Sequence, residues 1–281
     1  MKKRRIVCLV IAAMFCLSTV SFAITPIAAN ASMQANTENR YLVRGGSPVG
    51  IVSERIDYTT RKVTTDVLFP QTPSYVSGYS CGVTGGGTVV AWYNSQVGGL
   101  IPGLASPGIK YGSTWFWAGQ NSAINDMFDN LEDYMGNNGS NGVTTLEYVA
   151  GLGYYMYTVG GKTMSVSTVR AGNNSLTSDF YSAMKNGKPV TLFLNGFNLM
   201  DFSALGNYTN YDTIYLTEYE GLHVMVAYGY LTLSYYDSSS NTIPFREDTY
   251  LYVASCGFIG NAWLRINSNC TLDAAYTTHV S

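Results

Sequence analysis

The stretch Cys81-Gly-Val-Thr-Gly-Gly-Gly-Thr-Val-Val-Ala-Trp-Tyr93 predicts a helix that runs from Cys81 to about Gln96. Its second half is apolar, and Gly98-Gly99 ends it. Each glycine at positions 85–87 weakens a helix by about 1 kcal/mol relative to alanine, so such a run is expected where the helix packs closely against another backbone. The alternative is a flexible glycine-rich loop, but not a phosphate-binding one, because no Lys-Ser or Lys-Thr pair follows the glycines.

The segments around this helix predict further helices first and strands afterwards. Apolar residues recur at helical spacing in three segments: 121–135, 144–152 and 175–186. They alternate with a period of two in six segments: 62–69, 189–195, 213–218, 222–231, 249–255 and 262–267. Helices followed by strands favour an α+β fold with an antiparallel sheet over a doubly wound fold.

The composition limits the chemistry that the chain can perform. Its 281 residues are 46% hydrophobic and 12% charged, which allows one large domain or two small ones. It has only two histidines, so a multi-histidine metal site is nearly excluded, and we expect neither a metal nor a cofactor. Any general base of the imidazole type must be His223 or His279.

The N-terminus has the features of a secretory signal. Residues 2–5 are Lys-Lys-Arg-Arg, an apolar stretch covers 6–24, and Ala29-Asn30-Ala31 is the small-x-small pattern that a signal peptidase accepts. A membrane anchor is the rival interpretation, but Ser18 and Thr19 interrupt the apolar stretch. We therefore expect a secreted protein, extracellular or associated with the cell wall, with a signal of the Gram-positive kind.

This interpretation divides the chain into a signal peptide at 1–31, an N-terminal arm or possible propeptide at 32–61, and one domain at 62–281. Removing the signal leaves 12 basic and 18 acidic residues, and therefore a net charge of −6. An acidic surface argues against nucleic acid as a partner, because phosphates require a basic one. No stable membrane insertion is expected once the signal is removed, and the oligomeric state stays open.

Three cysteines remain after the signal is removed: Cys81, Cys256 and Cys270. An odd number in a secreted chain leaves at least one thiol unpaired. Cys256 and Cys270 are close enough in sequence to form a disulfide, although the spacing does not prove one. Cys81 then remains as the single thiol whose presence needs an explanation.

Cys81 and His223 have the placement that thiolate catalysis requires. At a helix start, the exposed amides favour a thiolate and face an oxyanion that forms at a scissile carbonyl. His223 opens an apolar strand 142 residues later, within the window of about 130–150 residues typical of papain-type enzymes. Each residue alone has a plainer interpretation, as a buried apolar thiol and as a core histidine. His279, the third-last residue, is expected to be solvated.

Three segments resemble secreted bacterial papain-like cysteine peptidases, in the branch similar to bacteriocin-processing peptidases. Residues 81–93 resemble the helix that carries the nucleophile, 184–192 the entry into the sheet, and 221–230 the strand with the histidine. The resemblance covers roughly 62–268. It implies a papain-like fold, with the nucleophile helix packed on a C-terminal antiparallel sheet, and a peptide or protein substrate cleaved by Cys81 and His223.

The sequence departs from this family at the oxyanion side chain. The family often places a glutamine five or six residues before the nucleophile, where this chain has Val76 and Tyr75. Gln71, ten residues away, could serve only if the loop folds back.

The third catalytic residue, usually Asn or Asp after the histidine strand, is also missing. Ser255 is nearest to its place and Asn261 lies further along. Two hypotheses follow. The chain is a secreted cysteine peptidase or related amide hydrolase, or it is a non-catalytic secreted binding or surface protein that keeps the fold.

Overall fold

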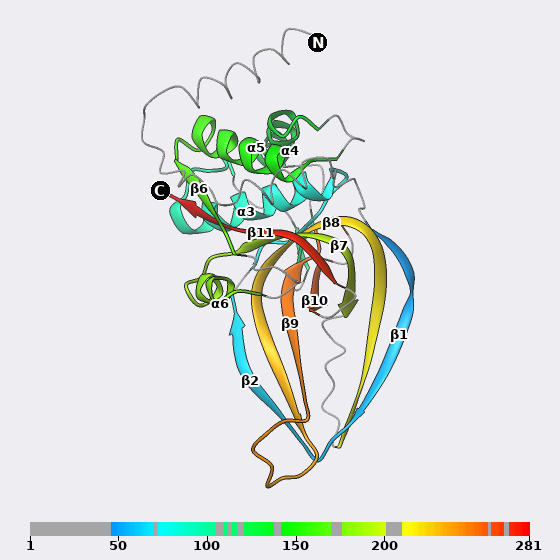
Figure 1. Ribbon diagram of the computed structural model, residues 1–281. Helices are drawn as coiled ribbons and strands as arrows, with labels where there is room; N and C mark the ends of the chain where they lie inside the picture. Colours follow the sequence, from blue (N-terminus) through cyan, green and yellow to red (C-terminus); the bar gives the residue numbers. More distant parts are fainter. Residues whose placement is uncertain are drawn as a thin grey trace.

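A computed structural model describes residues 46–69, 72–104, 109–111, 114–116, 121–137, 142–169, 176–200, 210–257, 260–266 and 270–281 (Figure 1). The predicted signal peptide, Gln71 and the first part of the predicted N-terminal arm lie outside these residues. In the described ranges, no helix has both the length and the apolar character needed to span a membrane.

The protein combines helices with a large antiparallel sheet. The sheet has the strand order β1-β8-β9-β10-β7-β11-β6, and β2 also pairs with β8. Its strands are β1 (Ser47–Asp57), β2 (Thr60–Leu68), β6 (Met164–Thr168), β7 (Val190–Met200), β8 (Tyr211–Tyr236), β9 (Arg246–Ala254), β10 (Asn261–Arg265) and β11 (Thr271–Val280). A small second sheet contains β3 (Tyr75–Val76), β4 (Ile109–Tyr111) and β5 (Thr114–Phe116).

The four described helices are α3 (Cys81–Val97), α4 (Ser122–Tyr134), α5 (Thr145–Thr158) and α6 (Ser178–Lys185). Each coincides with a predicted helix within a few residues, except that α5 extends six residues beyond its predicted end. The helices α3, α4 and α5 lie together at one end of the sheet, whereas α6 lies beside its edge (Figure 1). The position of α3 between the other helices and β8 makes it the central helix of the core.

Strand β8 differs most from the prediction. The sequence predicts two strands that are separated near Gly221, but β8 continues for 26 residues. Gly221 has a φ of 99°, which glycine adopts at little cost, so this position bends the strand instead of ending it. β8 forms an arch whose two ends meet at the turn between β1 and β2 (Figure 1). There the amide of Tyr58 donates to Asn210, and that of Thr59 donates to Tyr236.

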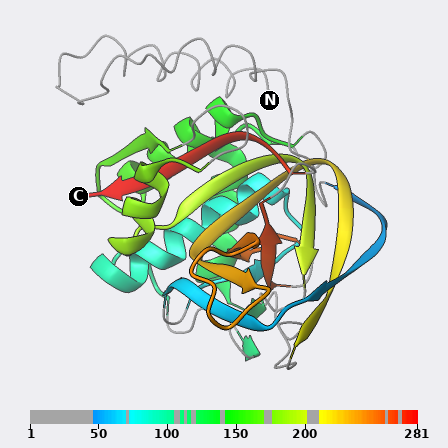
Figure 2. The same cartoon turned by 60° about the horizontal axis from the view of Figure 1, so that its bottom comes forward.

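The segment predicted as an N-terminal arm contributes directly to the sheet. Within it, β1 pairs with the first half of β8, from Ser47 opposite Glu220 to Asp57 opposite Tyr211. Viewed from the end where β1 and β2 meet, β1, β2 and β8 curve around β9 and β10 (Figure 2). The described part of the arm therefore belongs to the same structural unit as the residues that follow it.

The glycines of α3 permit close packing on several sides of the helix. Residues 81–93 are all buried. An ideal Cβ at Gly85 would lie 3.1 Å from Val224 of β8, and one at Gly87 would lie 2.5 Å from the ring of Phe128 in α4. The close approach that the sequence predicts is therefore present, but it is made to side chains of different elements and not to one neighbouring backbone.

We expect Gly87→Ala to lower the free energy of unfolding by about 1–2 kcal/mol, because overpacking against Phe128 costs more than the roughly 1 kcal/mol gained in helix propensity. Gly153→Ala in α5 is the matched control, since its Cβ would meet only the end of the flexible Met164 side chain at 3.3 Å. The free energy of unfolding of this control variant is expected to rise by up to about 1 kcal/mol. Urea unfolding measures both changes, and a stabilised Gly87→Ala protein would contradict the packing argument.

Candidate functional site

Cys81 is the first residue of α3 and has no exposed surface. The side chain of Ser80 caps the helix and accepts a hydrogen bond from the amide of Val83 at 3.3 Å. The helix therefore begins at Cys81, directly after its N-cap Ser80, as the sequence predicts. This location puts Cys81 in the first turn, where the amide dipoles of a 17-residue helix favour negative charge.

A second thiol, that of Cys256, lies against the same helix. Its Sγ is 3.7 Å from the position of a Cβ on Gly85, one turn after Cys81. Burial raises the pKa of Cys256 far above its ordinary value, and the nearby Cys81 raises it further. The Cys256 thiol is therefore protonated at neutral pH, and it donates weakly to the carbonyl of Ala254 at 3.4 Å.

The possible disulfide between Cys256 and Cys270 is not formed. None of the described cysteines, Cys81, Cys256 and Cys270, forms a disulfide, and all three are buried. Burial raises the pKa of Cys270 to about 12, so this thiol is also protonated at neutral pH. Cys256 contacts α3, and this location explains its burial without a covalent bond.

His223 lies in β8 and is fully buried. Its ring stacks on Phe197 with the centroids 5.4 Å apart, and its Nε2 lies 2.5 Å from the backbone carbonyl oxygen of Ser255. Burial lowers the pKa of His223 to about 4, and the hydrogen bond to Ser255 opposes this effect. The ring is therefore neutral at pH 7. Because a carbonyl can only accept, we assign the proton to Nε2 and the lone pair to Nδ1.

The structure brings together the two segments that carry the predicted pair. Val224, which follows His223, packs 3.1 Å from the Cβ position of Gly85, one turn after Cys81. Adjacent side chains leave a strand on opposite faces, so the His223 ring does not follow Val224 toward Gly85. The ring instead lies against Phe197 and Ser255. The segments are thus neighbours, but the thiol that lies near Cys81 is that of Cys256, and the His223 ring contacts Ser255.

The contact of Ser255 with the imidazole is made by its backbone. The sequence identifies Ser255 and Asn261 as possible third residues through their side chains. In the structure, the Ser255 carbonyl accepts from His223, and Asn261 pairs with Ala254 at the start of β10. No side-chain motif could have indicated this acceptor, because every residue type has a backbone carbonyl.

Tyr75 and Val76, which stand where the family often has its oxyanion glutamine, form the short strand β3. Tyr75 is fully buried, and its ring makes an edge contact with Phe128 at 5.4 Å. Gln71 lies outside the described residues, so the Cys81 amide remains the oxyanion donor that we expect from the sequence.

His279 is a residue of the sheet and not a solvated tail residue. It lies in β11 opposite Ser165 of β6, and its Nδ1 is 3.0 Å from Nζ of Lys188. Both burial and Lys188 lower its pKa below the ordinary value. The alternating pattern of the last ten residues was the signal that could have predicted this strand.

Two results concern ligands and relatives. Within the ranges that the structure describes, no three residues among His, Cys, Asp and Glu are grouped so that they could hold a metal ion. The chain matches no family model, no curated protein and no solved structure. The resemblance to papain-like peptidases therefore rests on the short segments around Cys81, Lys185 and His223.

Proposed function

We propose that the protein is a cysteine peptidase or a related amide hydrolase, with Cys81 as nucleophile and His223 as base. The observation that carries this proposal is the hydrogen bond from Nε2 of His223 to the Ser255 carbonyl. In papain-like enzymes the side chain of an Asn or Asp accepts this hydrogen bond. In this chain we infer that the backbone carbonyl of Ser255 takes that role. With the proton on Nε2, the lone pair of Nδ1 is available as the base.

The proposed reaction uses the thiol and the imidazole in turn. The reaction requires an opened form in which the His223 ring reaches the thiol; there Nδ1 of His223 takes the thiol proton, and the sulfur of Cys81 bonds to the substrate carbonyl carbon. The amide of Cys81 donates to the oxyanion. The imidazolium then gives its proton to the leaving amine, and water hydrolyses the thioester with His223 again as base. The Ser255 carbonyl orients the ring throughout and stabilises the imidazolium less well than a carboxylate would.

The complete burial of Cys81 and His223 favours a second function from a different class. A thiol without exposed surface can react only when its surroundings open. A protein that uses the same architecture to bind a ligand has no need of such opening. This alternative is a non-catalytic secreted binding or surface protein, in which Cys81 is an inert core residue.

Thiol labelling of the native protein tests the mechanism. Under the hydrolase proposal, iodoacetamide should modify Cys81 faster than Cys256 and Cys270, which are internal controls with equal burial. His223→Ala should slow this reaction at least about tenfold, because a positioned base contributes about 10²–10⁴-fold. Ser255→Ala is the matched control that keeps the backbone carbonyl, and it should label at the wild-type rate.

Cleavage of a peptide library distinguishes the two functions. Activity that disappears in Cys81→Ser would support the hydrolase and exclude the non-catalytic alternative. Equal labelling of the three cysteines, with no difference between wild type and His223→Ala, would contradict the proposed mechanism.

A further inference from the structure

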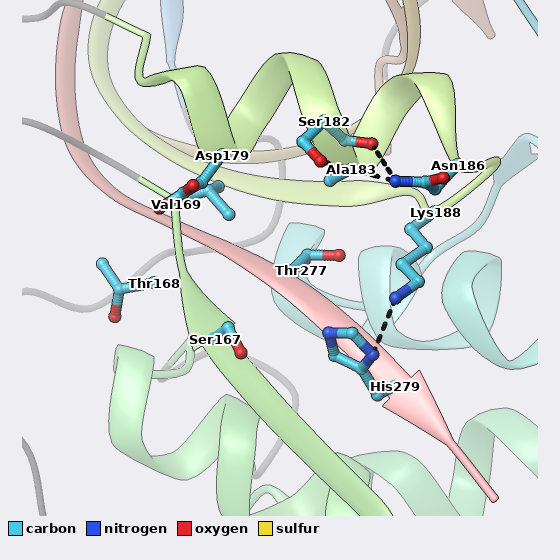
Figure 3. A pocket seen from close by; sticks show the side chains of 10 residues that line it. All are labelled: Ser167, Thr168, Val169, Asp179, Ser182, Ala183, Asn186, Lys188, Thr277 and His279. Atoms are coloured by element: carbon cyan, nitrogen blue, oxygen red, sulfur yellow. Dashed lines mark hydrogen bonds between the residues drawn. The ribbon is translucent and has the colours of Figure 1, made fainter. Parts of the chain in front are cut away.

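A cavity of about 270 Å³ lies between α6, β6 and β11, and it is formed by residues that the hydrolase proposal does not use (Figure 3). Small-molecule pockets usually have volumes of about 300–1,000 Å³, so this cavity suits a ligand smaller than a typical drug. Most of the side chains that line it are polar, among them those of Ser167, Ser182 and Thr277. The cavity is therefore suited to a small hydrogen-bonding ligand.

One end of the cavity is basic. Nζ of Lys188 donates to Nδ1 of His279 at 3.0 Å, and both side chains line the cavity (Figure 3). Because His279 accepts this bond, its ring is neutral and does not compensate the ammonium charge. In the described part of the chain, Lys188 forms no ion pair with a carboxylate. Its remaining N–H groups can therefore bind an anionic group.

The opposite end of the cavity is acidic. Asp179 lies in the first turn of α6, is exposed, and also lines the cavity. The eight-residue helix α6 is about 12 Å long, and Lys188 lies just after its end, where its amide donates to the Ala183 carbonyl. The two charges are thus held at opposite ends of α6. A ligand that satisfies both must carry a cation toward one end of the helix and an anion toward the other.

We propose that this cavity binds a short peptide of two or three residues with free ends. Its terminal carboxylate pairs with Lys188, and its terminal ammonium pairs with Asp179. Three extended residues span about 10 Å, which is comparable with the length of α6 between the two charges. The opposed charges fix the direction of the peptide, and charge-assisted hydrogen bonds at both ends provide the affinity. This proposal does not depend on catalysis by Cys81.

Titration of the full chain with tri-alanine tests the proposal through the NMR signal of the His279 ring. The chain has only two histidines, and His279→Gln assigns the signal. We expect a saturable shift for tri-alanine and an affinity at least tenfold lower for the N-acetylated or C-amidated peptide. Lys188→Met should also weaken binding at least tenfold. Lys185→Met, which removes an exposed lysine from the same helix, should leave it unchanged.

Several results would overturn the proposal. Acetate or inorganic phosphate binding as tightly as tri-alanine would identify an anion site only. Equal losses of tri-alanine affinity in Lys185→Met and Lys188→Met would show that the peptide is attracted non-specifically by positive charge. Asp179→Asn provides an independent variant, because this exposed residue can change without disturbing the core, and unchanged tri-alanine affinity in it would exclude the zwitterionic ligand.

Discussion

Replacing Arg61 by methionine is expected to lower the free energy of unfolding by about 3 kcal/mol, because it leaves the Asp212 carboxylate buried without its cation. Arg61 in β2 contacts both carboxylate oxygens of Asp212 in β8, at 2.7 and 2.8 Å. The Asp212 side chain is only 6% exposed. The hydroxyl of Tyr58 contacts Asp212 at 3.3 Å but cannot replace the charge. Chemical unfolding in urea measures the change.

The position of this ion pair explains the size of the effect. Arg61 and Asp212 lie beside the turn at which the two ends of the β8 arch meet, so the pair joins segments that are 151 residues apart in the sequence. Loss of the pair therefore weakens the closure of the arch between β1, β2 and β8. We expect Asp212→Asn, added to Arg61→Met, to recover about 1–2 kcal/mol, since it removes the stranded charge.

The neighbouring strand offers a matched control. Arg55 and Asp57 of β1 form an ion pair with the same 2.7 Å distance, but their side chains are 58% and 68% exposed. Arg55→Met should change the free energy of unfolding by less than about 1 kcal/mol, because solvent screens exposed pairs. Similar losses in Arg55→Met and Arg61→Met would show that burial does not determine the contribution of the Asp212 pair.

The features that could be predicted from the sequence are those that local pattern determines. The helix at Cys81 was predictable because its apolar half and Gly98-Gly99 mark its extent, and α6 because its apolar residues recur at helical spacing. The continuity of β8 was not predictable, since a glycine with positive φ can either end a strand or bend it. β1 was missed because its charged residues resemble those of a solvated arm.

The parts of the candidate site that depend on distant contacts were not predictable. Cys81 and His223 are identifiable by residue type, position and spacing. The burial of both residues and the proximity of Cys256 to Cys81 follow from how α3 packs on β8, which no local pattern records. The contact of Ser255 with His223 involves a backbone group, and the contact of Lys188 with His279 joins residues 91 positions apart.

His223 should make the protein less stable as the pH falls from about 6.5 to 4.5. The folded state holds the pKa of His223 at about 4, below the ordinary value of 6.5 that the unfolded chain recovers. Between these values the unfolded state binds the proton more readily, so acidification favours unfolding. The contribution of His223 is present above pH 6.5, and a part on the order of 2 kcal/mol is lost by pH 4.5.

Urea unfolding of wild type and His223→Gln at several pH values isolates this contribution. Glutamine can still donate a hydrogen bond to the Ser255 carbonyl but does not titrate, so the variant should lose less stability between pH 6.5 and 4.5. Glu54, whose pKa is lowered to about 2 by Arg246, contributes to the pH dependence mainly at lower pH. His279→Gln controls for the less buried histidine. Parallel stability curves for wild type and His223→Gln would mean that the imidazole is not held neutral in the folded protein, and the proposed base would then already carry the proton that it must accept.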